Sequence, residues 1–208
     1  MIAEGGKGII SSMFLLGSFI LILSIIIPSL LILFVLILIL TILLMIFFRD
    51  PERRVGEGIV SPADGRIIDI NEIDDPDVGE SIKISIFMNL FDVHVNRMPL
   101  DGRILRIERT KGSFLPAFLK NADKNERNTI LAETEIGKVK IVQIAGMLAR
   151  RIVCYIREGD FLRKGERIGM IRFGSRVDLI LPRRGIEIRV RKKDRVKAGA
   201  DGIAEIHG

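Results

Sequence analysis

An uncharged run of forty residues, 9–48, constrains the fold of this 208-residue chain more than any other feature. As one α-helix it would be about 60 Å long, roughly twice the thickness of the hydrocarbon core of a bilayer. Pro28 and Ser29 divide it into segments of eighteen and nineteen residues, 10–27 and 30–48, each near the minimum for one crossing. We therefore expect an N-terminal transmembrane helical hairpin broken at Pro28, with a single kinked or tilted helix as the alternative. The run is too long for the apolar core of a cleavable signal peptide.

The rest of the chain, residues 49–208, is long enough to form one domain with its own hydrophobic core. Arg49, Arg53 and Arg54 follow the apolar run directly, and Lys and Arg next to a membrane span favour the cytoplasmic side. We expect residues 1–48 to anchor the protein in the cell membrane and residues 49–208 to lie on its cytoplasmic side.

Beyond residue 51 the pattern changes to short stretches rich in Ile and Val, separated by Gly, Asp, Asn and Pro. Several of them alternate apolar and polar residues, which is typical of half-buried strands. The domain is therefore predicted to be mainly β, a compact barrel or sandwich with one or two short helices. The helices are expected at residues 115–121, with an extension to Arg127 left open, and near Met147. Examples of the expected strands are residues 65–70, 81–88, 102–108, 139–144, 152–156, 166–172, 177–181 and 186–190.

Basic residues are concentrated near the carboxyl end of the chain. Residues 150–197 contain sixteen Lys or Arg against six Asp or Glu. Such a surface attracts anionic lipid headgroups or nucleic acid, or it only keeps the domain soluble; the membrane anchor favours lipid over nucleic acid. Cys154 is the single cysteine, so no disulfide can form within the chain, and its apolar surroundings predict a buried thiol.

Few residues offer catalytic chemistry. Of the two histidines, His207 is the penultimate residue, whereas His94 lies in a strand-like stretch dense in polar side chains. Asp64 precedes a glycine in a turn-like segment. Gly174 and Ser175 interrupt a strand-like run, which suggests a bulge or a close backbone approach. The chain shows no zinc-ligand spacing, phosphate-binding loop or nucleophile elbow.

The segment FDVHVNR at residues 91–97, followed by FGSRVD at residues 173–178, resembles the short, membrane-associated branch of the phosphatidylserine decarboxylases. Residues 61–66, 112–120, 125–128, 142–146 and 149–151 resemble the same family. Each segment is weak alone, but the ordered set is specific and covers nearly all of residues 51–182.

This resemblance implies a proenzyme that cuts itself between Gly174 and Ser175 into chains 1–174 and 175–208, which stay together as a heterodimer. Ser175 Oγ attacks the carbonyl of Gly174, and Ser175 is converted into a covalent pyruvoyl group, the only cofactor expected; no metal is implied. By resemblance, His94 is the base that activates Ser175 and Asp64 orients it, because a hydroxyl needs an adjacent base to act as a nucleophile.

In turnover the resemblance implies that the pyruvoyl group forms a Schiff base with the amine of phosphatidylserine or archaetidylserine, which releases carbon dioxide and leaves the ethanolamine lipid. His94 is the histidine available to return the proton. Larger members of the family carry a second histidine where this chain has Arg97, so a second proton donor stays open. Two alternatives are a non-catalytic membrane-tethered β module that binds anionic lipid or a protein, and a pyruvoyl enzyme for a soluble amino acid.

Overall fold

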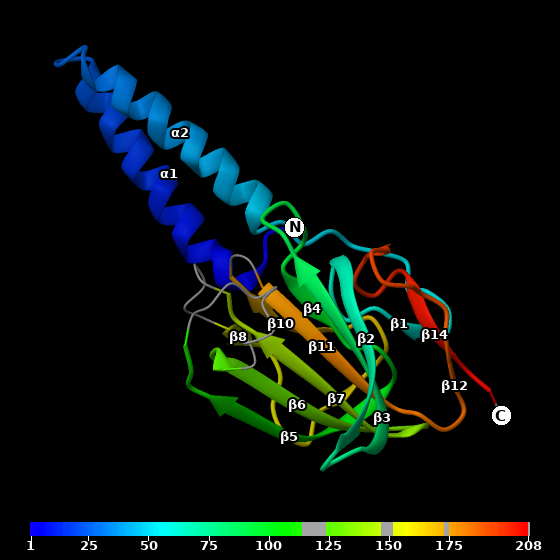
Figure 1. Cartoon of the computed structure of the whole chain (residues 1–208). Coiled ribbons are helices and arrows are strands. Elements are labelled where there is room, and N and C mark those ends of the chain that lie inside the picture. The colour runs from blue at the N-terminus through cyan, green and yellow to red at the C-terminus, as the bar shows by residue number, and fades with distance from the viewer. Residues whose placement is uncertain (114–123, 147–151, 173–174, 208) are drawn as a thin grey trace. The chain divides into compact units, whose positions relative to one another are not determined.

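The computed structural model describes residues 1–113, 124–146, 152–172 and 175–207. The helices predicted at residues 115–121 and near Met147 lie outside these ranges. The chain divides into two compact units, Met1–Pro51 and Glu52–Gly208, and each is described by itself (Figure 1).

The first unit is an antiparallel helical hairpin. Helix α1 (Glu4–Ser24) and helix α2 (Leu30–Phe47) flank the predicted break at Pro28. The ends of the hairpin meet where the Ala3 amide donates a hydrogen bond to the Phe48 carbonyl, 2.8 Å away. A Cβ atom at Gly6 would lie 2.3 Å from the Phe48 ring, so glycine permits this close approach. Both helices are long and apolar enough to cross a membrane. The two-helix hairpin is confirmed, and the single kinked helix is excluded.

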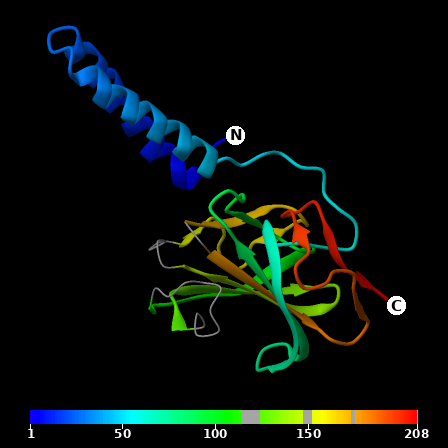
Figure 2. The ribbon, with the colours of Figure 1, turned by 45° about the horizontal axis from the view of Figure 1, so that its top comes forward.

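The second unit is built on one curled eight-stranded sheet in the order β13-β2-β3-β11-β7-β6-β5-β9, antiparallel throughout. Register shifts between Ile67 and Asp69 and between Ile104 and Arg106 mark bulges, which increase local twist. Figure 2 shows the resulting curl from a second direction. The strands are β2 (Gly65–Asp75), β3 (Gly79–Met88), β5 (Gly102–Thr110), β6 (Arg127–Thr134), β7 (Gly137–Ile144), β9 (Phe161–Leu162), β11 (Ser175–Pro182) and β13 (Arg195–Val196).

Two small antiparallel sheets complete the unit. One has the order β4-β10-β8, with β4 (Val95–Arg97), β10 (Arg167–Ile171) and β8 (Ile152–Cys154). The other has the order β1-β14-β12, with β1 (Ile59–Val60), β14 (Gly202–Ile206) and β12 (Ile186–Ile188). Both contribute to one core with the large sheet, in which Ile86, Ile168 and Ile203 are completely buried. The prediction of a mainly β domain behind a helical hairpin is confirmed.

Two details of the sequence prediction were wrong. Residues 127–134 form β6, which the pattern did not predict, because Leu131, Ala132 and Glu133 favour helix when read without neighbours. Pairing with β5 and β7 on both sides decides the conformation. Cys154 is exposed rather than buried, because it is the last residue of the edge strand β8.

Candidate functional site

Ser175 is the first residue of β11, an interior strand paired with β3 and β7. Side chains alternate along a strand, so Ser175 shares the core-facing side of β11 with Val177 and Leu179. The serine is completely buried, and its Oγ has no hydrogen-bond partner among the described residues. An unbonded buried hydroxyl costs free energy, so it suggests a use other than stability. Gly174 lies outside the described residues.

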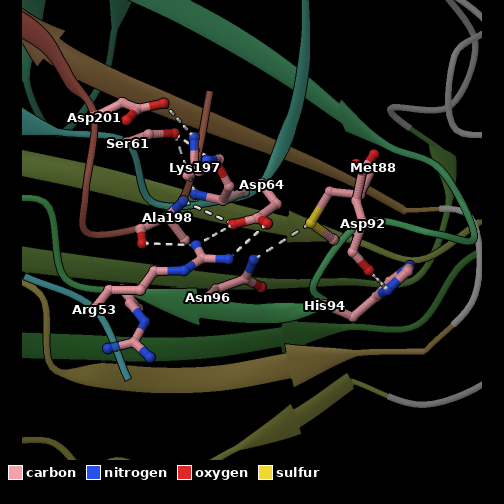
Figure 3. A network of polar contacts seen from close by, with 12 residues as sticks. Arg53, Ser61, Asp64, Met88, Asp92, His94, Asn96, Lys197, Ala198 and Asp201 are labelled. Carbon is pink, nitrogen blue, oxygen red and sulfur yellow. Dashed lines mark hydrogen bonds and ion pairs between the residues drawn. The ribbon is translucent and has the colours of Figure 1, made fainter. Parts of the chain in front are cut away.

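His94 is also completely buried and directly precedes β4. Its Nδ1 lies 2.9 Å from the carbonyl oxygen of Asp92, as Figure 3 shows. Because a carbonyl oxygen only accepts hydrogen bonds, Nδ1 must carry the proton. In the neutral ring, Nε2 is then the basic nitrogen, as a general base requires.

Asp92 holds the histidine loop in place. One carboxylate oxygen accepts a hydrogen bond from the Asn89 amide at 2.9 Å, and the other pairs with Arg195 at 2.6 Å. The side chain of Asp92 therefore fixes the backbone whose carbonyl holds His94. Arg195 did not appear as a site residue in the sequence, since it lies 103 residues from Asp92.

Asp64 lies in a different contact from the one expected. Its carboxylate pairs with both terminal nitrogens of Arg53, one pair at 2.8 Å, and accepts a hydrogen bond from the Ala198 amide at 2.8 Å. Figure 3 shows Asp64 turned toward these groups and His94 turned toward Asp92. No hydrogen bond joins Asp64 to His94 in the part of the chain that the structure describes.

The turn around Asp64 nevertheless reaches the strand that follows His94. The carbonyl of Pro62 accepts a hydrogen bond from the Arg97 amide of β4 at 2.9 Å. A Cβ atom at Gly65 would lie 2.2 Å from the Phe87 carbonyl oxygen, so the residue after Asp64 has to be glycine for the turn to pack against β3. Asp64 therefore stabilises a turn that supports β4.

A chain of buried amides connects the large sheet to β4, a strand of the small sheet β4-β10-β8. Asn128 donates to Gln143 at 2.9 Å, Gln143 donates to Asn96 at 2.8 Å, and Asn96 donates to the sulfur of Met88 at 3.6 Å. Met88 is the register partner of Ser175 in β3. His94 and Asn96 are two residues apart, and the His94 carbonyl accepts a hydrogen bond from the Ile171 amide of β10. The structure thus brings Ser175 and His94 into one buried region whose parts are connected through Met88 and Asn96.

On the opposite face of β11, Arg176 forms a buried ion pair with Asp178, with Nε 2.9 Å from Oδ1. Burial raises the pKa of the Asp178 carboxyl, and the opposing effect of Arg176 does not cancel it. Since the folded state binds this proton more tightly than the unfolded state, the contribution of Asp178 to stability is greatest at low pH and is lost as pH rises through the raised pKa.

The other candidates lie apart from Ser175. His207 pairs with Glu187 on the surface, so it takes no part in the buried region. Arg97, for which the sequence resemblance left a second proton donor open, donates to the Gly165 carbonyl at 2.9 Å. The described ranges contain no group of three or more His, Cys, Asp or Glu side chains placed to hold a metal ion.

The fold and the site define a mainly β protein with a buried serine and a buried, oriented histidine, carried by a chain with two candidate membrane spans. The family model described as phosphatidylserine decarboxylase matches residues 40–204. The chain belongs to this family, as the motifs at residues 91–97 and 173–178 predicted.

Individual relatives agree with this assignment. The putative archaetidylserine decarboxylase proenzyme of Methanosarcina mazei is 48% identical over 166 residues, which cover 78% of this chain and 75% of the relative. The phosphatidylserine decarboxylase proenzyme of Syntrophus aciditrophicus is 49% identical over 160 residues, 74% of this chain and 75% of the relative. That of Carboxydothermus hydrogenoformans is 43% identical over 171 residues, 79% of this chain and 80% of the relative. The family is thus one of decarboxylase proenzymes.

Proposed function

We propose that the chain is a self-cleaving proenzyme that decarboxylates a serine phospholipid, phosphatidylserine or archaetidylserine, to the ethanolamine lipid. The observation that carries this proposal is Ser175 itself. It is a completely buried serine at the start of β11, and its Oγ has no hydrogen-bond partner among the residues that the structure describes. Its register partner, Met88, accepts a hydrogen bond from Asn96, two residues after the buried His94. These features fit a serine that is consumed in forming a pyruvoyl group.

In self-cleavage, His94 Nε2 takes the proton of Ser175 Oγ as the oxygen attacks the carbonyl carbon of Gly174, and the proton passes to the nitrogen of Ser175 as the Gly174–Ser175 C–N bond breaks, which leaves an ester. Elimination of this ester frees the carboxylate of Gly174 and leaves a dehydroalanine at position 175, which water hydrolyses to the pyruvoyl group with loss of ammonia. The hydrogen bond from Nδ1 to Asp92 supports the role of His94, since it leaves Nε2 as the basic nitrogen of the neutral ring. Asp64 contributes as a positioning residue. Its ion pair with Arg53 holds the turn whose Pro62 carbonyl bonds to β4.

In turnover, a pyruvoyl group at position 175, held at the start of β11, would supply the carbonyl chemistry that stabilises the electron pair left when the substrate loses carbon dioxide. The protein must then return a proton to the substrate carbon, and we assign this second task to His94. The burial of Ser175 and His94 keeps bulk water away from the reaction.

We place the β unit on the cytoplasmic side of the cell membrane. Arg49 and Arg54 follow the second candidate span directly, and Lys and Arg in such positions favour the cytoplasmic side. The phospholipid substrate then lies in the same membrane that holds the helical hairpin.

The two products of cleavage should stay together. Residues 175–208 provide β11 in the interior of the large sheet, β13 beside β2, and β14 between β1 and β12. Strands that share a core in this way separate only when the core unfolds. The two fragments should therefore co-elute in size-exclusion chromatography at high salt and separate only in denaturant. Separation by salt alone would contradict a shared core.

The function is tested by reconstituting the full chain into vesicles that contain phosphatidylserine or archaetidylserine. We expect headgroup conversion to the ethanolamine lipid, measured by mass spectrometry of the extracted lipids, with release of carbon dioxide. The Ser175→Ala variant is the control and should convert neither lipid. If wild-type protein that has been shown to be cut converts neither lipid, the proposed substrate class is wrong.

A further inference from the structure

The loop that joins β3 to β4 (Figure 1) carries two large apolar side chains that are exposed and that lie close in sequence to His94. Leu90 is 46% exposed and Phe91 is 75% exposed. These residues come directly before Asp92, whose carbonyl holds His94, and shortly after Met88, the register partner of Ser175. We call Leu90 and Phe91 the apolar tip.

The apolar tip is held in a defined conformation. The Asn89 side chain accepts a hydrogen bond from the Phe91 amide at 2.8 Å, and the Asn89 amide donates to the Asp92 carboxylate at 2.9 Å. The Asp92 amide donates in turn to the Asn89 carbonyl at 3.1 Å. Because the turn is fixed on both sides of Leu90 and Phe91, the exposure of the tip is a property of the loop and carries no further ordering cost on contact with a partner.

Basic side chains lie at the base of the tip, where β2 and β13 flank the end of β3. Arg195 contacts Asp92 at the base of the loop, and it pairs in register with Arg66, which itself pairs with Phe87 just before β3 ends. The exposed turn that leads into Arg195 carries Arg191, Lys192 and Lys193 farther along β2, where Lys192 lies 3.6 Å from Asp69. An apolar tip with a basic rim is complementary to a membrane surface, where apolar side chains enter the hydrocarbon boundary and cations meet lipid phosphates.

We propose that the apolar tip inserts into the bilayer and places the catalytic region at the depth of the lipid headgroups. This inference rests on the proposed function, since a phospholipid substrate makes the bilayer the partner. The hairpin tethers the β unit to the membrane. Insertion of the tip is then an intramolecular step, so it does not require the tip alone to bind the membrane tightly. The tip would bring the headgroup to His94 without extraction of the lipid from the bilayer.

A fluorescence experiment tests insertion without relying on turnover. The chain contains no tryptophan, so Phe91→Trp introduces a single reporter. The matched control is Phe161→Trp, because Phe161 is also exposed, at 60%, but lies in β9 at the edge of the large sheet opposite β13. In vesicles with lipids brominated along the acyl chains, the Phe91→Trp emission should be quenched and blue-shifted, since interfacial apolar groups lie about 5–10 Å into the boundary. Equal quenching of the two variants would overturn the proposal. An emission of Phe91→Trp that is blue-shifted but not quenched would also overturn it, because a protein rather than lipid would then cover the tip.

A second measurement uses Leu90→Ser/Phe91→Ser in the full chain. The quantity is the ratio of turnover on bilayer phosphatidylserine to turnover on a short-chain phosphatidylserine that dissolves as monomers. If the tip inserts into the bilayer, this ratio should fall about tenfold in the double variant, because roughly the burial of one apolar side chain is lost. The Phe161→Ser variant should leave the ratio unchanged. An unchanged ratio in the double variant would refute insertion. Failure of the wild-type protein to convert either lipid would refute the proposed function instead.

If Phe91→Trp does not fold, Leu90→Trp takes its place in the quenching test.

Discussion

Replacing Ser175 by alanine is expected to leave the protein as one uncut chain of 208 residues, with no decarboxylase activity. The wild-type protein should yield residues 1–174 and a fragment of 34 residues, 175–208, that has no free amino terminus and reacts with carbonyl reagents. The variant lacks the nucleophile, and nothing else at position 175 can form the new carbonyl group. Intact-mass measurement distinguishes one chain from two fragments directly.

The Ser175→Ala variant should also fold, since Ser175 Oγ has no hydrogen-bond partner among the described residues. Removing an unbonded buried hydroxyl costs little, or stabilises the fold by about 1 kcal/mol. Ser81→Ala is the matched control, because Ser81 is buried in β3 opposite Pro182, at the other end of β11. It should be cut like the wild type. Cleavage of Ser175→Ala between residues 174 and 175 would disprove the serine mechanism.

Most of the β fold could be predicted from the sequence, because strand alternation is a local signal. In β11, for example, Val177, Leu179 and Leu181 face the core, as the pattern of Ile and Leu indicated. Strand β6 was missed, since its conformation depends on β5 and β7 rather than on its own residues. The exposure of Cys154 was missed for a similar reason: the edge position of β8 is a property of the sheet.

The candidate site was only partly predictable. Ser175 and His94 were found through their motifs, whereas the residues that hold them come from distant parts of the chain. Gln143 bonds to Asn96 across 47 residues, and Arg195 bonds to Asp92 across 103. Such pairings depend on how strands align in space, and no local spacing encodes them. The ion pair of Arg53 with Asp64 escaped notice because Arg53 was interpreted only as a charge beside the membrane.

Family membership also weighs against a non-catalytic lipid-binding module. The basic residues of the turn at 191–195 were compatible with either function, since they indicate only a preference for anionic surfaces. The named relatives are decarboxylase proenzymes. A decarboxylase is therefore favoured over a non-catalytic module.

Replacing His94 by alanine should slow self-cleavage by about 10²–10⁴-fold, the usual contribution of a positioned general base. The expected phenotype is accumulation of uncut chain, followed over time after cell-free synthesis. Asp92→Asn keeps the carbonyl that accepts from Nδ1 but weakens the pairing with Arg195, so it should slow cleavage less than His94→Ala. Cleavage of His94→Ala at the wild-type rate would exclude His94 as the base.

The same assay decides how Asp64 acts. If Asp64 supports β4 only through its ion pair with Arg53, then Arg53→Ala and Asp64→Ala should slow cleavage to similar extents. The double variant should then be no slower than either single variant, because both remove one interaction. Arg189→Ala is the control, since Arg189 pairs with Glu205 at 2.7 Å on the surface and should not affect cleavage. If Asp64 instead orients His94 directly during the reaction, Arg53→Ala should cut almost normally while Asp64→Ala does not. That outcome would restore the direct pairing of Asp64 and His94 implied by the sequence resemblance and would confine Arg53 to stabilising the turn.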